Sequence, residues 1–190
     1  MKSRVKLPNI RKGEFEGMKE KIKDPKWTPD YGINEIHPTF GVIGIGARIP
    51  LIAYNIDLDT TNIKQAKQIA KAIRFSSGGY RHIQAGPVYL ESRGHCQVTM
   101  NILDYQKNPL YRILETVKME ALRYHINVPS CELVGLIPKQ ALLDSLRYYF
   151  AVEKQEYNKD MTLEEIVTYS KKYIGLRDFD ILKIIEANIN

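Results

Sequence analysis

The fold of this chain is decided by residues 51–104, which read LIAYNIDLDTTNIKQAKQIAKAIRFSSGGYRHIQAGPVYLESRGHCQVTMNILD. The stretch begins with a run of β-branched and aromatic residues, 51–58, that has the length of a strand. Asn62 can cap the helix that follows, and the apolar residues of that helix recur on one stripe. Two further strands, at 81–91 and 95–104, are joined by a short turn with the sequence SRG. The stretch therefore predicts a strand, a helix and a β-hairpin.

The next segment adds a second helix and a fourth strand. Asn108-Pro109 opens an amphipathic helix, because proline is favoured at the first helical position. Residues 131–137 form the fourth strand, and Pro138 begins a third helix. The order β-α-β-β-α-β is that of the ferredoxin-like split βαβ fold, within the α/β (α+β) class. Such a sheet carries its helices on one face and leaves the other face open.

Further helices follow this unit. Thr162 and Glu165 form a capping box at the start of one helix, and Gly175 ends it. Asp180 is expected to cap a last helix at 181–187. The sequence thus predicts a ferredoxin-like sheet followed by C-terminal helices.

The two faces of the sheet differ in polarity. Successive side chains of a strand point to opposite faces, so Val98, Met100 and Ile102 should lie under the helices. The opposite face carries amides and a hydroxyl, from Asn55, Gln97, Thr99 and Asn101. Such groups can fix an uncharged heterocycle by hydrogen bonds. The more common alternative is a sheet face that is only wetted by solvent.

The N-terminal segment differs from the rest of the chain. Residues 1–30 hold nine Lys or Arg and five Asp or Glu, and they form a basic leader with a short helix near 14–22. This leader lacks the apolar stripe that it needs to fold alone, so we expect it to lie on another surface. Residues 31–50 are rich in Gly and Pro and are predicted to be an extended loop before the body at 51–190.

Composition excludes several classes of protein. Of the net charge of +6 over 190 residues, most lies in the leader, so the body does not have a nucleic-acid-binding composition. The open-face positions also lack the aromatic side chains on which RNA bases stack. No apolar run reaches the ~18 residues of a membrane span, and no apolar signal core follows the first residues. Cys96 and Cys131 match no metal or redox spacing, so we expect a cytoplasmic protein with buried thiols.

Two further motifs match no established ligand signature, although the glycines at 41–46 fit either a flexible approach to the first strand or close backbone contact with a ligand. Gly41, Gly44 and Gly46 precede a strand instead of a helix, and no Gly-Lys-Ser/Thr follows, which argues against a P-loop or a dinucleotide site. The histidines show no metal-ligand spacing, so no metal site is expected. They are His37, His82, His95 and His125.

Several spaced segments resemble glutamate formimidoyltransferase, which also forms the first part of formimidoyltransferase-cyclodeaminase. The segments are LPNIRKGEFEGMKEKIKDPKWTPDYG, HPTFG, GARIPLIAYNIDL, CQVTMNILDY and CELVGLIPKQALLD. That family transfers a formimidoyl group from N-formimidoyl-L-glutamate to tetrahydrofolate in histidine degradation. Its transferase region has two similar subdomains whose sheets face each other across a folate-binding tunnel. The resemblance implies that 51–190 is the C-terminal subdomain and that 1–30 is the end of the N-terminal one.

The resemblance also assigns candidate binding residues. Its folate-binding segment corresponds to residues 32–41, which are Gly32, Ile33, Asn34, Glu35, Ile36, His37, Pro38, Thr39, Phe40 and Gly41. The polar face of the sheet becomes the tunnel wall, with Arg48, Asn55, Gln97, Thr99 and Asn101 as expected wall residues. Tetrahydrofolate is then a co-substrate, and no metal is implied.

The family's catalytic histidine belongs to the N-terminal subdomain, and no histidine of this chain lies in a matching motif. The resemblance therefore assigns no catalytic residue here. It implies the folate-contacting half of a split transferase, with N-formimidoyl-L-glutamate and folate as ligands. An N-terminal subdomain on another chain would complete the enzyme, and the assembly would be an oligomer. A non-catalytic folate-binding or protein-interaction module with the same fold is the alternative.

Overall fold

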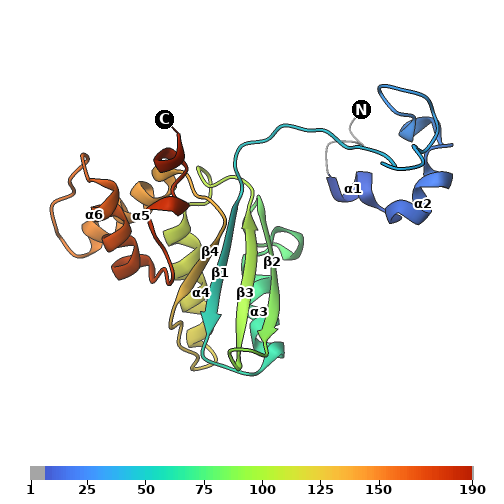
Figure 1. Cartoon of the computed structure of the whole chain (residues 1–190). Helices are drawn as coiled ribbons and strands as arrows, with labels where there is room; N and C mark the ends of the chain where they lie inside the picture. Colours follow the sequence, from blue (N-terminus) through green and yellow to red (C-terminus); the bar gives the residue numbers. More distant parts are fainter. Residues whose placement is uncertain (1–6, 190) are drawn as a thin grey trace. The chain divides into compact units, whose positions relative to one another are not determined.

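The computed structural model describes residues 7–189, and the chain divides into two compact units after Arg48. The second unit is built on four antiparallel strands, β1 (Ile52–Leu58), β2 (Ile83–Leu90), β3 (His95–Ile102) and β4 (Cys131–Val134). Their order across the sheet is β2-β3-β1-β4 (Figure 1). Together with the intervening helices, this order confirms the ferredoxin-like α+β fold that the sequence predicts.

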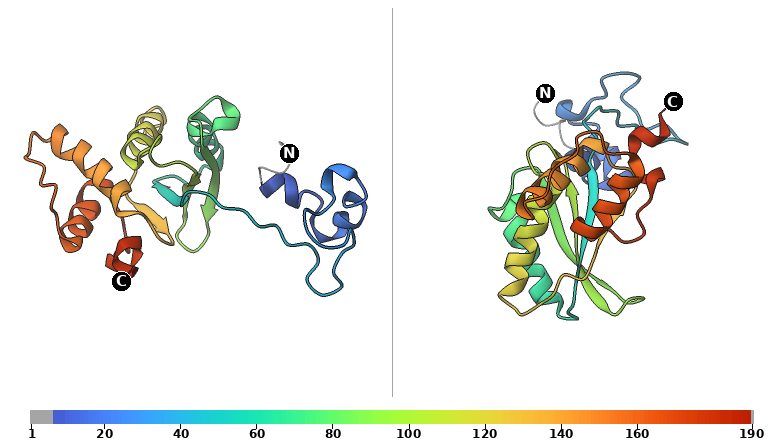
Figure 2. Two further views of the ribbon diagram at one scale, coloured as in Figure 1. Left: turned by 90° about the horizontal axis from the view of Figure 1, so that it is seen from above. Right: turned by 90° about the vertical axis from the view of Figure 1, so that its left-hand side faces the viewer.

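Helices cover one face of the sheet. The two crossover helices, α3 (Ile63–Ile73) and α4 (Leu110–Leu122), both lie on this side (Figures 1 and 2). Beneath them is the apolar face expected from the alternation of side chains, none of whose members is more than 3% exposed: Ile52, Tyr54, Ile56, Leu58, Val98, Met100 and Ile102. The apolar stripes of the helices and of the strands therefore meet in one core.

Local signals in the sequence fix where the helices begin. The side chain of Asn62 accepts a hydrogen bond from the backbone N–H of Lys64, as an N-cap should. Pro109 precedes α4, and Pro138 precedes the long helix α5 (Lys139–Val152). Proline has no backbone N–H to leave unsatisfied at a helix start, so both positions suit it.

The C-terminal region follows the prediction up to Gly175. Helix α6 (Leu163–Tyr169) begins with the capping box of Thr162 and Glu165, and it continues into a π-helical turn, η4 (Ser170–Ile174). Residues 175–177 then run beside β4, because the N–H of Cys131 donates to Gly175 O and the N–H of Arg177 donates to Cys131 O, at 2.8 and 2.9 Å. This pairing brings the end of the chain to the edge of the sheet.

The expected last helix at 181–187 is wrong. The structure has two 3₁₀ turns instead, η5 (Ile181–Lys183) and η6 (Ile185–Asn188), and Asp180 makes no side-chain capping bond. Ile184 between them is extended, because the backbone on either side of it pairs with Ile137. The predicted strand at 131–137 is also shorter than expected, because β4 ends at Val134 and Gly135 follows with a left-handed φ of +82°.

The first unit is small and has little core. It contains α1 (Leu7–Arg11), α2 (Glu14–Lys21) and the 3₁₀ turn η2 (Pro25–Trp27), so the helix expected near 14–22 is confirmed. Lys21 ties them together, since its Nζ donates to three carbonyls at the end of α1 and lies 4.1 Å from the ring centre of Trp27. Among the hydrophobic residues described in this unit, Ile22 alone is buried.

Candidate functional site

The face of the sheet opposite α3 and α4 carries a grid of mostly polar side chains. The strand register sets the grid, because residues paired across neighbouring strands share a face. One row runs from Gly86 through Thr99 and Asn55 to Glu132. A second row joins Val88, Gln97 and Asp57, and a third joins Gln84, Asn101, Ala53 and Val134.

Asp57, on the second row, is the centre of a buried polar network. Its side chain is fully buried. Oδ1 accepts from Gln97 Nε2 at 2.8 Å, and Oδ2 accepts from Ser130 Oγ at 2.6 Å and from Arg177 Nε at 3.1 Å. His95 Nε2 lies 3.3 Å from Oδ1. Four side chains from three separate parts of the chain thus enclose one carboxylate.

Arg177 links this carboxylate to a second one. Its Nη2 lies 3.0 Å from Oε2 of Glu132, and its Nη1 lies 3.1 Å from Oδ2 of Asp178. Glu132 Oε2 also accepts from Asn55 Nδ2 at 3.2 Å and from Gln97 Nε2 at 3.3 Å. We call Asn55, Asp57, His95, Gln97, Ser130, Glu132 and Arg177 the open-face network.

The environment of Asp57 determines its charge. Burial acts to raise the pKa of this carboxyl, but the hydrogen bonds from Ser130, Gln97, Arg177 and His95 outweigh burial and hold the pKa below its ordinary value. Asp57 is therefore ionised at neutral pH. Burial likewise opposes the charge of Arg177, and the contacts to Asp57 and Glu132 overcome it and raise the pKa of the guanidinium.

The structure separates the wall residues expected from the sequence. Asn55 and Gln97 are brought together in the network, where Gln97 is only 3% exposed. Thr99 and Asn101 are half-buried, and their side chains make no hydrogen bond within residues 7–189. Thr99 and Asn101 are thus free to contact a ligand, whereas Gln97 is already engaged. Arg48 is exposed and belongs to the first unit.

Sequence reasoning missed much of this network. Parity places Asp57 beside Asn55 on the open face, and the register of β4 adds Glu132, so both could have been found by extending the same argument. Arg177 could not, since it lies 120 residues from Asp57 and outside any strand. It reaches the face because residues 175–177 pair with β4.

The segment at 32–41 forms a tight loop in the first unit. The backbones of His37 and Gly41 exchange two hydrogen bonds, at 3.1 and 2.9 Å. Inside the loop, His37 Nδ1 accepts from the N–H groups of Thr39 and Phe40, at 3.2 and 3.1 Å. Gly41 has a φ of +66°, and a Cβ there would lie 3.1 Å from Cε2 of Phe15, so this position requires glycine. The loop is therefore held in shape by its own contacts.

The same segment exposes large apolar side chains. Phe40 and Ile33 are exposed to a similar extent, 73% and 74%, and Tyr31, just before the segment, is 93% exposed. The ring of Phe40 lies against the ring of His37, with ring centres 5.1 Å apart. A rigid loop with bare apolar side chains is suited to contact a ligand or another protein surface.

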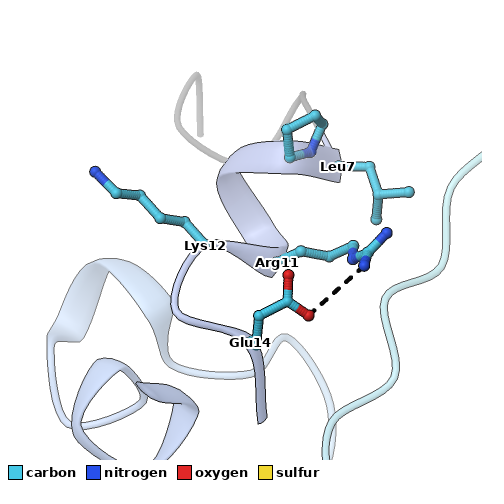
Figure 3. A pocket seen from close by; sticks show the side chains of 5 residues that line it. Leu7, Arg11, Lys12 and Glu14 are labelled. Atoms are coloured by element: carbon cyan, nitrogen blue, oxygen red, sulfur yellow. Dashed lines mark ion pairs between the residues drawn. The ribbon is translucent and has the colours of Figure 1, made fainter. Parts of the chain in front are cut away.

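A surface hollow in the first unit is a weaker candidate. Figure 3 shows its lining, in which Arg11 points toward Glu14 and the two side chains form an ion pair of 3.6 Å. Leu7, Pro8 and Lys12 complete the lining, and all five residues are exposed. A hollow with such walls cannot remove a ligand from water, so we assign no site to it.

The described residues lack two other kinds of feature. Residues 7–189 contain no group of three or more His, Cys, Asp or Glu side chains arranged to hold a metal ion. None of the helices in that range has the length and apolar character that a membrane crossing requires.

Comparisons with known proteins agree with both units. The formiminotransferase domain family matches residues 53–190, and the N-terminal subdomain of the formiminotransferase domain matches residues 1–48. A glutamate formimidoyltransferase of Streptococcus pyogenes serotype M1 is 50% identical over 158 residues, which cover 83% of this chain and 53% of that protein. One from Thermoplasma acidophilum is 42% identical over 136 residues, covering 72% of this chain and 45% of the relative.

A longer relative shows the same similarity. The formimidoyltransferase-cyclodeaminase of Rattus norvegicus is 38% identical over 160 residues, which cover 81% of this chain and 29% of the relative. The chain therefore spans about half the length of the two glutamate formimidoyltransferases and less than a third of the bifunctional protein. The family resemblance read from the sequence is confirmed, and the chain belongs to the formiminotransferase domain family.

Proposed function

We propose that this chain supplies the folate-contacting half of a glutamate formimidoyltransferase and works with an N-terminal subdomain carried by another chain. One observation carries the proposal. A four-stranded sheet with a polar face opposite α3 and α4 follows a first unit in which, of the hydrophobic residues described, Ile22 alone is buried. The family match adds that this first unit corresponds to a stretch of the N-terminal subdomain.

The first unit supports the need for a partner. A unit of this size stabilises itself by burying apolar surface, and this one leaves most of its large apolar side chains in water. Those more than 60% exposed are Phe15, Tyr31, Ile33, Phe40, Ile43 and Ile45. An N-terminal subdomain that covers them would contribute the missing core, and the resulting oligomer would bury at least ~1,000 Å².

The reaction needs a general acid–base, and no residue of this chain is assigned that role. N5 of tetrahydrofolate attacks the formimidoyl carbon, a C–N5 bond forms, and the bond from that carbon to the glutamate nitrogen breaks. The proton lost from N5 must leave, and the departing nitrogen must gain one, so a general acid–base with a pKa near neutrality is required. The partner subdomain would provide it. This chain would bind and orient the substrates, which lowers the entropic cost of bringing two molecules together.

The candidate contacts divide between the two units. In the first unit, the loop 32–41 offers Phe40, Ile33 and the exposed edge of the His37 ring to a folate. In the second, Thr99, Asn101 and the outer part of the open-face network offer hydrogen-bonding groups. These residues, with Arg48 in the first unit, are the proposed binding residues of each unit taken by itself.

A reconstitution assay tests the proposal. The purified chain is mixed with the part of the Streptococcus pyogenes relative that it does not cover, and glutamate release from N-formimidoyl-L-glutamate is followed with tetrahydrofolate present. We expect activity from the mixture and none from either component. Phe40→Ala should raise the KM for tetrahydrofolate, while the matched control Phe75→Ala, an exposed aromatic of the second unit, should not.

The other outcomes are equally informative. Turnover by the chain alone would overturn the requirement for a partner. Saturable folate binding without transfer in any mixture would favour the non-catalytic module. Gly41→Val is a poor probe for this test, because its effect on the loop would combine strain at φ +66° with a clash against Phe15.

A further inference from the structure

The two carboxylate oxygens of Glu132 differ in their hydrogen-bond and ion-pair partners. Oε2 is approached by Asn55 Nδ2, Gln97 Nε2 and Arg177 Nη2, at 3.2, 3.3 and 3.0 Å. No side chain or backbone group in residues 7–189 donates to Oε1. The Glu132 side chain is 29% exposed. One oxygen is therefore held in place by two hydrogen bonds and an ion pair, while the other keeps its lone pairs for a group from outside the chain.

The row of residues that contains Glu132 continues across the open face of the sheet, from β4 to β2, with space above its far end. Asn55, Thr99 and Gly86 follow it across the sheet, and Thr99 makes no side-chain hydrogen bond within the described chain. A Cβ added to Gly86 would meet nothing within 4 Å, and its backbone is not in the left-handed region. Three strand spacings of ~4.8 Å separate β4 from β2, so the row is roughly 14 Å long. This length accommodates a planar bicyclic ring.

The charge of the network favours a ligand that donates hydrogen bonds. The guanidinium of Arg177 is shared by three carboxyl groups, those of Asp57, Glu132 and Asp178, so acidic groups outnumber the basic one. His95 also faces Asp57. An ionised carboxylate oxygen makes its strongest hydrogen bonds to N–H donors, above all to planar groups with positive charge. Glu132 thus offers an acceptor at one end of a flat, polar row.

We propose that Glu132 recognises a planar N–C–N edge carrying N–H donors, with the row from Asn55 to Gly86 as the surface beneath the ligand. This inference rests on the proposed function, and there two groups have the required chemistry. One is the formimidoyl group of N-formimidoyl-L-glutamate, an amidine that is protonated at neutral pH. The other is the aminopyrimidinone edge of a tetrahydrofolate. Glu132 is a binding residue in this scheme and takes no proton.

Binding measurements on the full chain test the proposal without requiring turnover. The probes are formamidinium chloride, N-formimidoyl-L-glutamate and 5-formyltetrahydrofolate, titrated by NMR or calorimetry. Glu132→Gln keeps an oxygen for Arg177 but replaces the free acceptor with an amide donor. It should weaken binding of whichever probe carries the recognised edge by at least about tenfold, the value of one hydrogen bond to a charged group.

Two further variants separate recognition from folding. Gly86→Val fills the far end of the row without backbone strain, so it should leave the melting temperature unchanged and weaken 5-formyltetrahydrofolate while sparing formamidinium. Glu120→Gln is the matched control, since this glutamate pairs with Arg123 on α4, on the covered side of the sheet. It should bind every probe as the wild type does.

The outcomes show whether Glu132 recognises a ligand and which of the two ligands it is. If Glu132→Gln loses binding of only the two amidine probes, the recognised group is the formimidoyl group. If it loses binding of only 5-formyltetrahydrofolate, the recognised group is the pterin edge. Wild-type binding by Glu132→Gln, or no binding of any probe by the wild-type chain, would overturn the inference. If Glu132→Gln unfolds, wild-type affinity of Gly86→Val for both 5-formyltetrahydrofolate and N-formimidoyl-L-glutamate would overturn it instead. Reconstituted activity that is insensitive to Glu132→Gln would leave the proposed function standing while this inference fails.

Discussion

The two faces of β1 differ in the interactions that hold their side chains in place. On the covered face, Tyr54 and Ile56 are fully buried in the hydrophobic core. On the open face, one residue away, Asn55 and Asp57 are held by hydrogen bonds and ion pairs to side chains of β3, β4 and the segment after η4. The covered face is specified by packing, which needs only apolar residues at alternate positions. The open face is specified by directional contacts, which need particular partners.

The largest expected effect comes from the covered face. Ile56→Ala removes a fully buried side chain and leaves a cavity, so we expect a loss of about 2–5 kcal/mol in the free energy of unfolding. The neighbour Asn55→Ala, on the open face, should cost about 1 kcal/mol, because it removes a single hydrogen bond to Glu132. Urea denaturation measures both. Equal losses in the two variants would show that the faces do not differ as described.

Arg177→Met tests the open-face network itself. The methionine keeps much of the side-chain volume but removes the charged hydrogen bond to Asp57, so the free energy of unfolding should fall by about 1.5–3 kcal/mol. Arg123→Met is the matched control, since its partner Glu120 lies outside the network, and the melting temperature should not change. An unchanged stability in Arg177→Met would mean that Ser130, Gln97 and His95 alone satisfy the carboxylate.

The dependence of stability on pH should report Asp57. Because its pKa in the folded chain lies below the ordinary value of 3.8, its contribution is fully present above that value. The contribution is lost as the pH falls through the lower, folded pKa. Asp57→Asn should therefore be less stable than the wild type at pH 7, and the difference should shrink as the solution is acidified below pH 3.8. A difference that stays constant with pH would contradict the assigned charge.

The smallest effect concerns the two cysteines of the covered face. Cys96 and Cys131 are both buried, and burial raises the pKa of both thiols, that of Cys131 to about 12. A thiol reagent at pH 8 should leave both unmodified in the folded chain and label both in urea, because the thiolate is the reactive form. Rapid labelling of either residue without denaturant would show that this face opens more readily than its packing implies.

The same contrast explains what the sequence could predict. Alternation along 51–58 and 95–104 identified the covered face of β1 and β3, because packing depends on residue class and period. Capping signals at Asn62 and Thr162 placed two helix starts correctly. The arginine in the network and the extended Ile184 were not predictable, since both depend on backbone pairing between the C-terminal segment and distant residues.

The claim that the open face binds substrate is tested most directly by the side-chain amides on it. Isotope-labelled chain is titrated with 5-formyltetrahydrofolate, and the amide resonances of Asn55, Gln97 and Asn101 are followed together with the backbone of Gly86 and Glu132. We expect saturable shifts in this set and none on the outer surfaces of α3 and α4. Shifts confined to those helices, or none at millimolar ligand, would contradict the account.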